Sequence, residues 1–370
     1  MKRVLIILMI AAVAVSLMLV GCQKSTTETT AAATETTAAA TETTAAAETT
    51  AAAAETTAVE VKKGPFKIVW VPSVMGIPFF KLESDGFKTA LDEFGDQLTY
   101  IGGEKGTPEE QVEILNNLII QKVDAIDLVP TDPKALNSIS KKAMDSGIKT
   151  VENGSSNMKT FVNMSTIIFD PDEVGRLLME MAGEITNYEG DFAILSAAST
   201  STAQNDWIAG LQKALKDPKY SKMKLVGTVY GDDIREKSYN EAMGLFKSYP
   251  TLKCIVSPTS VGIAAGAAAI TDAKLIGKVV ITGLGLPSEM KDYIKNGACP
   301  KCGIWSPLEL GYFNAMVCHY LCTGELTGKK GEKFTAGNLG EYEVKEDGII
   351  VFGRLSYFDK TNIDEFAAKF

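Results

Sequence analysis

Few side chains of this chain have the type and spacing of a catalytic site. The sole histidine, His319, lies inside the helical run GYFNAMVCHYLC (311–322), a setting more typical of a structural residue. The sequence contains no G-x-S-x-G elbow, no H-E-x-x-H pair and no phosphate-binding G-x-x-x-x-G-K-[ST] loop. Acidic residues are plentiful, but no spacing sets a catalytic pair apart. We therefore predict that the chain is not an enzyme.

Four cysteines have a spacing that zinc sites also use. Cys299 and Cys302 form a C-x-x-C pair, and Cys318 and Cys322 follow one helical turn apart. Against a metal, Cys302 begins a predicted strand and the later pair lies on one face of a helix with apolar neighbours. Cysteine is also among the most frequently buried residue types. We predict buried thiols or a local disulfide, and no metal or cofactor.

The stretch DFAILSAASTSTAQNDW, residues 191–207, has the composition of a binding segment. Its apolar run ends at Ser196 and passes into hydroxyl and alanine residues, after which Gln204, Asn205 and Trp207 arrive together. Amide groups both donate and accept hydrogen bonds, as the hydroxyls of a sugar require. The segment is either a plain connection or the rim of a pocket.

Strand and helix patterns alternate along the chain from Phe66 onward and would position such a rim. An amphipathic helix is predicted at 79–94, and TPEE at 107–110 is a capping box that opens another. Buried strands are predicted at 66–71, 124–129, 147–151, 191–196, 224–230, 253–258 and 278–283. This alternation of strands and helices predicts an α/β fold with parallel sheets flanked by helices, divided into two Rossmann-like lobes. In such sheets ligands bind beyond the carboxyl ends of the strands, where the loop 197–207 lies.

The N-terminal residues have the pattern of an export signal. Lys2 and Arg3 precede an apolar run at 4–20, and the run ends in LVGC at 19–22. This ending resembles the lipobox of bacterial lipoproteins, which implies cleavage before Cys22 and a lipid anchor on it. The alternative is an ordinary signal peptide or a membrane helix with a chance cysteine. We predict a signal peptide at 1–21 and a disordered Thr/Ala/Glu-rich tether at 22–65, because this tether lacks the apolar residues of a core.

Several long segments together resemble one family. GDFAILSAASTSTAQNDWI, TVYGDDIREKSYNEAMGLFKSYP, CIVSPTSVGIAA, VVITGLGLPSEM and GIWSPLELGY are similar to the sugar-binding proteins of bacterial ABC importers, of the type I periplasmic binding protein fold. The rhamnose-type and autoinducer-2-type receptors are the closest subgroup. The resemblance implies two hinged lobes that close over one small ligand, with residues 66–155 and 306–338 in the N-terminal lobe. The C-terminal lobe would hold residues 156–305 and 339–370.

The resemblance also implies which residues bind the ligand. Phe79 and Phe80 follow the first strand, and Gln204 matches a ligand-bonding amide flanked by Asn205 and Trp207. Two further positions, Pro258 and Ser260, present backbone groups to the ligand in the family. Trp305 falls where ribose-type relatives place a ligand-contacting side chain. The predicted ligand-binding set is thus Phe79, Phe80, Gln204, Asn205, Trp207, Pro258, Ser260 and Trp305.

Three positions depart from the family pattern. Ser73 stands in place of a lysine, Gly154 in place of an aspartate, and Ala203 in place of an aspartate or asparagine. Glu152 or Asn153 would substitute for one lost group if their loop were shifted. The pocket has thereby lost charge of both signs at these positions, which favours a neutral ligand.

The function implied is that of a monomeric solute receptor held at the extracytoplasmic face of the membrane by its lipid. It would capture a neutral monosaccharide, rhamnose-like or another deoxy-sugar, and deliver it to an ABC permease. The alternatives are an autoinducer-2 receptor, or a sensor that presents its ligand to a chemoreceptor or histidine kinase. The acidic net charge of −9 argues against a nucleic-acid partner.

Overall fold

The structure, a computed structural model, describes residues 63–370. The predicted signal peptide, Cys22 and most of the predicted tether lie outside the described residues. No helix within residues 63–370 is long and apolar enough to cross a membrane.

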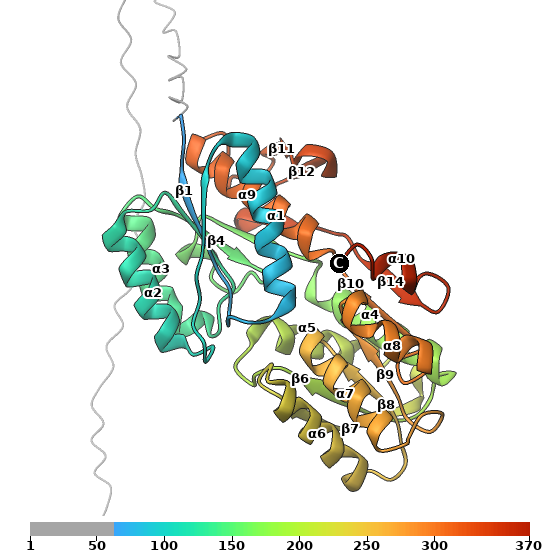
Figure 1. The fold of residues 1–370 in the computed structure, drawn as a ribbon. Helices are drawn as coiled ribbons and strands as arrows, with labels where there is room; N and C mark the ends of the chain where they lie inside the picture. Colours follow the sequence, from blue (N-terminus) through green and yellow to red (C-terminus); the bar gives the residue numbers. More distant parts are fainter. Residues whose placement is uncertain (1–62) are drawn as a thin grey trace, which may run out of the picture. The chain divides into compact units, whose positions relative to one another are not determined.

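The first of the two main sheets, in which Figure 1 labels β1 and β4, has six parallel strands in the order β13-β5-β4-β3-β1-β2. Its strands are β1 (Lys67–Val71), β2 (Gln97–Tyr100), β3 (Ala125–Leu128), β4 (Lys149–Asn153), β5 (Met164–Ile167) and β13 (Ile349–Val351). Helices α1 (Pro78–Phe94) and α9 (Pro307–Thr323) pack on one face, and α2 (Pro108–Gln121) and α3 (Pro133–Asp145) cover the other. Because both faces are covered, β1 is apolar on both, with Ile68 and Trp70 in one core cluster and Val69 and Val71 in the other.

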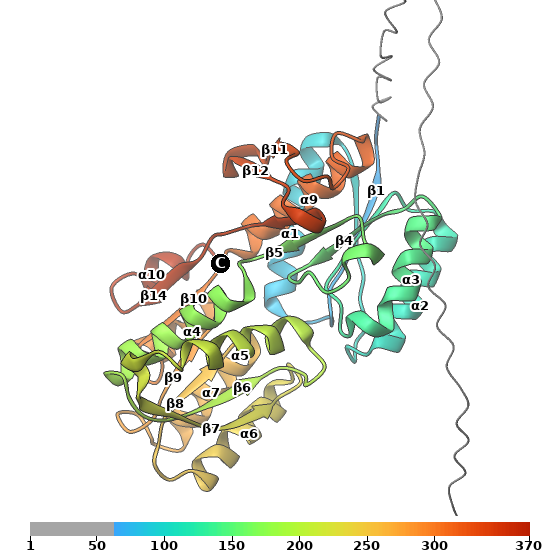
Figure 2. The same cartoon turned by 180° about the vertical axis from the view of Figure 1, so that it is seen from behind.

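The second sheet has four parallel strands in the order β7-β6-β8-β9. They are β6 (Glu189–Ser196), β7 (Lys222–Tyr230), β8 (Leu252–Ser257) and β9 (Val280–Gly283). Helices α4 (Pro171–Thr186) and α5 (Thr202–Ala214) pack together, and α6 (Arg235–Ser248) and α7 (Ser260–Asp272) form a second pair (Figure 2). Helix α8 (Pro287–Asn296) lies beside α7 (Figure 1). The predicted α/β architecture with two helix-flanked parallel sheets is confirmed.

Shorter elements complete the two halves. β10 (Lys301–Ile304) contacts β9 and pairs antiparallel with β14 (Ser356–Asp359), and α10 (Ile363–Phe366) packs on α8. β11 (Lys333–Thr335) and β12 (Glu341–Glu343) form a small antiparallel pair. The chain passes between the halves three times, namely from β5 to α4, from β10 to α9 and from β13 to β14.

The boundaries of the lobes differ from those predicted. The predicted first lobe ended at residues 155 and 338, but β5 and β13 lie beyond those limits and pair within the first sheet. Both strands are only three or four residues long, so neither carries a periodic signal that the sequence alone would reveal.

Helices α1 and α9 approach each other unusually closely. A side-chain carbon at Gly311 would lie 1.9 Å from the carbonyl oxygen of Glu83, and one at Gly86 would lie 2.1 Å from that of Leu308. Only glycine permits this contact between the backbones. The contact brings the Glu83 turn of α1 against the part of α9 that carries Asn314.

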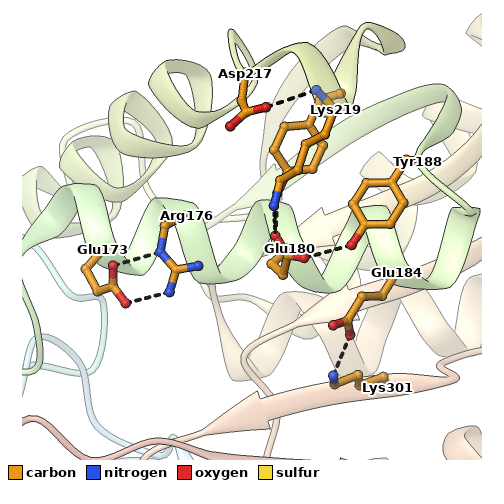
Figure 3. Close-up of polar contacts among 9 residues, drawn as sticks. Glu173, Arg176, Glu180, Glu184, Tyr188, Asp217, Lys219 and Lys301 are labelled. Atoms are coloured by element: carbon orange, nitrogen blue, oxygen red, sulfur yellow. Dashed lines mark hydrogen bonds and ion pairs between the residues drawn. The ribbon is translucent and has the colours of Figure 1, made fainter.

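Polar contacts along α4 tie this helix to its neighbours in the second half (Figure 3). Glu180 accepts hydrogen bonds from Lys219 and from the Tyr188 hydroxyl, the latter at 2.7 Å. The hydrogen bond from Lys219 lowers the pKa of the Glu180 carboxyl to about 2. One turn further, Glu184 pairs with Lys301 of β10 at 2.5 Å. Since these groups are partly exposed, they orient α4 more than they stabilise it.

The contacts of His319 are those of a residue that stabilises the fold. Its Nδ1 lies 2.6 Å from Asp96 Oδ2, and its ring stacks on Phe94 at 3.7 Å between centroids. Asp96 in turn accepts the backbone N–H of Phe66 at 2.8 Å. His319 therefore holds the start of β1 to α9.

The cysteines of residues 63–370 are Cys254, Cys299, Cys302, Cys318 and Cys322, and all five are buried. Cys254, Cys299, Cys302 and Cys318 are free thiols. Burial raises the pKa of Cys254, Cys299 and Cys318. Within this range no three cysteine, histidine or acidic side chains gather as a metal ion would require.

Candidate ligand-binding site

A cavity of about 460 Å³ is lined by residues from both sheets' loops. This volume falls within the range of small-molecule sites. In the first sheet β1 lies between β2 and β3, and in the second β6 lies between β7 and β8, so the strand order reverses at these points. The cavity is lined by residues at 73–80, 129–131, 197–204 and 258–260, which follow β1, β3, β6 and β8. It thus occupies the crevice where open α/β sheets bind ligands.

Four aromatic side chains of the predicted set line the cavity. Phe79 lies edge-to-face against Phe80 at 5.8 Å and against Trp305 at 6.4 Å between centroids, and Trp305 meets Trp207 at 5.6 Å. The indole Nε1 of Trp305 is buried and has no hydrogen-bond partner among the described residues. A ligand oxygen in the cavity would provide the missing acceptor.

Gln204 lines the cavity, and its amide also joins two loops of the second half. Its Oε1 accepts from Ser196 Oγ at 3.3 Å and from the Ala197 N–H at 3.2 Å. Its Nε2 donates to the Pro258 carbonyl at 3.3 Å, which leaves one N–H for a ligand. Pro258 and Ser260 both line the cavity as well.

Asn205 is the one predicted residue that does not line the cavity. Its side-chain nitrogen donates to the Ser199 carbonyl at 2.8 Å. Successive helical residues point about 100° apart, so the side chain after Gln204 turns away from the cavity and closes the loop before α5.

The three positions that depart from the family pattern all line the cavity. Gly154 has a φ of 84°, in the left-handed region, and a side-chain carbon there would meet nothing within 4 Å. Neighbouring Glu152 offers no substitute, because its carboxylate is fully buried and accepts the N–H groups of Asn157 and Met158 at 2.8 Å each.

Sequence reasoning missed an acidic loop at the cavity. Asp232 and Asp233 line it with φ values of 54° and 53°, a conformation that costs energy in non-glycine residues. Thr259 donates to the Asp233 carboxyl, and burial raises the pKa of Asp233 to about 6. The sequence does indicate this loop, because the GDD triplet directly follows the strand predicted at 224–230. It therefore lies at the carboxyl end of a strand, where ligands bind in such sheets.

A second missed group is buried beneath the cavity. Glu83 lines the cavity yet is 1% exposed, and its Oε1 accepts from Asn153 Nδ2 at 2.8 Å and from Asn314 Nδ2 at 3.4 Å. The same Asn153 nitrogen lies 2.9 Å from Asp127 Oδ1. Burial, and next the neighbouring Asp127, raise the pKa of Glu83 well above its usual range, while burial raises that of Asp127 to about 8. Charge is lost at Ser73, Gly154 and Ala203 as predicted, but the cavity retains ionisable groups at Glu83, Asp232 and Asp233.

Comparisons with known proteins agree with this geometry. A family model described as a periplasmic binding protein domain matches residues 68–326. An ABC transporter solute-binding protein from Clostridium phytofermentas, solved with bound L-rhamnose, is 33% identical with a TM-score of 0.80. That match covers 84% of this chain and 100% of the other.

More distant relatives share the fold. The LsrB protein of Clostridium saccharobutylicum, solved in complex with AI-2, is 20% identical with a TM-score of 0.76, over 81% of this chain and 99% of the other. A D-ribose/D-allose-binding protein of Pseudomonas aeruginosa is 24% identical over 239 residues, which are 62% of this chain and 74% of the relative.

Proposed function

This chain belongs to the periplasmic binding protein family, among the solute-binding proteins of ABC transporters, and on that premise we propose that it captures a neutral monosaccharide. The family consists of binding proteins, so the prediction that the chain is not an enzyme is confirmed. The proposed ligand is rhamnose-like or another deoxy-sugar, delivered to an ABC permease after the lobes close on it.

The observation that carries this proposal is the chemistry of the cavity. Aromatic rings from both halves line it, which suits the C–H faces of a sugar ring. The free indole N–H of Trp305 and the remaining N–H of Gln204 supply donors. The carboxyl groups of Asp232 and Asp233 also line the cavity and disfavour an anionic ligand. The rhamnose-bound relative supports the same ligand class.

A thermal-unfolding screen tests the ligand class. The panel holds L-rhamnose, D-ribose, D-allose, autoinducer-2 and a sugar phosphate. A neutral sugar at 100 times its Kd is expected to stabilise the fold by about 2.7 kcal/mol. Stabilisation by the sugar phosphate alone would contradict the proposal, and stabilisation by autoinducer-2 alone would favour the alternative receptor function.

The lipid anchor is a further part of the proposal and rests on the sequence, since Cys22 lies outside the described residues. We expect the Cys22→Ser variant to be released from membranes or to remain as unprocessed precursor. Membrane fractionation and the mass of the N-terminal peptide measure this outcome. Normal processing and retention of the variant would exclude an anchor at Cys22.

A further inference from the structure

Glu83, Asp127, Asn153 and Asn314 form a buried polar group beneath the cavity. Its two carboxyl groups have only amide partners among the described residues. Glu83 and Asp127 are 1% and 0% exposed, and one nitrogen, Asn153 Nδ2, serves both. Neither carboxyl has an ion pair to lysine or arginine in the described part of the chain. Two ionised carboxylates in this position would be costly, because neither has a compensating charge.

The oxygens of this group that have no hydrogen-bond partner indicate that one of its carboxyl groups carries a proton. Both asparagine side chains bond Glu83 through Oε1, and no protein group within residues 63–370 bonds Glu83 Oε2. Asp127 Oδ2 and Asn314 Oδ1 are buried oxygens without a partner. All three are acceptors, so a proton on a carboxyl supplies the kind of donor that the group lacks.

The group also contacts the cavity. Glu83 lies one helical turn beyond Phe80 on α1, and Glu83, Phe80 and Asn153 all line the cavity. The close contact between α1 and α9 at Gly311 fixes the Glu83 turn, and Asn153 ends β4 directly before Gly154. Glu83 therefore places an ionisable group at the first half's wall of the cavity, where Ser73 and Gly154 carry none.

We propose that Glu83 is a specificity-determining residue of the first half, which binds the ligand as a neutral carboxylic acid and donates its Oε2 proton to a ligand oxygen. This inference rests on the proposed function. The carboxylate form would add a second buried charge beside Asp127 in a cleft that dries on ligand binding. Sugar affinity therefore falls as Glu83 loses its proton with rising pH.

The ionisable groups around Glu83 set the direction of this pH effect. Asp127 faces it from β3, and Tyr100 from β2 is half-buried with a pKa raised to about 12 by burial and then by Glu83. Cys318 from α9 is close to Asp127. All of these become negative when they ionise, so each one favours the protonated form of Glu83.

The binding test measures L-rhamnose affinity of the full chain by calorimetry between pH 7 and pH 9. This range lies above the pKa of Asp233, which also lines the cavity and is raised to about 6. Wild-type affinity is expected to fall by about tenfold or more across this range, as a buried contact is lost. The Glu83→Gln variant keeps a donor and an acceptor but cannot ionise. We expect it to lose the pH dependence and to bind about tenfold tighter than Glu83→Ala at every pH. Glu109→Gln, an exposed change on α2, serves as the control and should keep the wild-type profile.

A ligand-free measurement makes the result independent of the choice of sugar. Carboxyl ¹³C NMR of glutamate-labelled protein should show a Glu83 signal, identified by its loss in Glu83→Gln, that is protonated at pH 7. An ionised Glu83 at pH 7, or a pH dependence of binding that persists in Glu83→Gln, overturns the inference. If wild-type protein binds sugar with an affinity that does not change with pH, only the Glu83 inference is contradicted. If no sugar binds at any pH, the proposed function is contradicted, and with it the proposed contact between Glu83 and the ligand.

Discussion

At the scale of single residues, Gln204 and Asn205 are sequence neighbours with different surroundings. Gln204 lines the cavity and links the loops after β6 and β8, whereas Asn205 bonds only its own loop through Ser199. The resemblance placed both in the predicted ligand-binding set, with Asn205 only as a flanking residue, and the helical geometry points their side chains in different directions.

We expect Gln204→Ala to weaken sugar binding by tenfold to a hundredfold, about 1–3 kcal/mol. The change removes a donor from the cavity and leaves the Ala197 N–H and Pro258 carbonyl without their partner. Calorimetry with the cognate sugar measures the loss. Asn205→Ala is the matched control and should change affinity by less than about threefold; equal losses in both variants would show that the amide has no role at the cavity.

Asp127 should make the stability of the fold depend on pH. Its pKa is raised to about 8 in the folded protein, against about 4 in an unfolded chain. Between these values the folded state binds more protons than the unfolded state, so the free energy of unfolding falls as pH rises through this window. The slope reaches about 1.4 kcal/mol per pH unit for one proton.

Asp127→Asn removes this contribution, so the variant should become more stable relative to wild type as the pH rises from 5 to 8. Urea unfolding of both proteins at each pH measures the difference. A stability difference that is constant across the range would mean that Asp127 is ionised in the folded protein.

At the scale of elements, the contact between α1 and α9 depends on glycine. Gly311→Ala would place a methyl group 1.9 Å from the Glu83 carbonyl oxygen, so the helices must separate. We expect a loss of about 1–3 kcal/mol in the free energy of unfolding.

Gly244, inside α6, is the matched control for that substitution, because a side-chain carbon there meets nothing within 4 Å. Gly244→Ala should stabilise the protein by about 0.5–1 kcal/mol through helix propensity. Thermal unfolding compares the two variants, and a neutral Gly311→Ala would mean that the helices move apart without cost.

At the scale of the whole molecule, three chain passages and a cavity lined from both halves predict closure on the ligand. A ligand that contacts both halves stabilises the closed state by its difference in affinity for the two states. We expect each sheet to move with its helices as one rigid part, and the passages between the halves to supply the hinge.

We expect the distance between spin labels at Lys134→Cys and Glu236→Cys to shorten when sugar is added. These positions lie at the starts of α3 and α6, one in each half, and both are exposed. The five described native cysteines are buried and thus shielded from the label. A pair within the first half, Lys88→Cys and Lys134→Cys, should keep its distance; an unchanged first pair at saturating sugar would exclude hinge closure.

The sequence by itself determined the alternation of buried strands and helices, because parallel strands covered on both faces must be apolar throughout. The capping box of α2 at Thr107 and Glu110 could also be predicted from the sequence, because it depends on two residues only three positions apart. The resemblance supplied seven positions that line the cavity, Phe79, Phe80, Gln204, Trp207, Pro258, Ser260 and Trp305.

Only the tertiary structure decided which polar residues meet. Glu83, Asp127 and Asn314 each interrupt an apolar pattern, a signal visible in the sequence, but they come from α1, β3 and α9 and are up to 231 positions apart. No local period encodes such a meeting, because it depends on how the two helices cross and on the strand order of the sheet. The same reason explains β5 and β13, whose pairing joins residues near 165 and 350 and so is set by packing of the whole half.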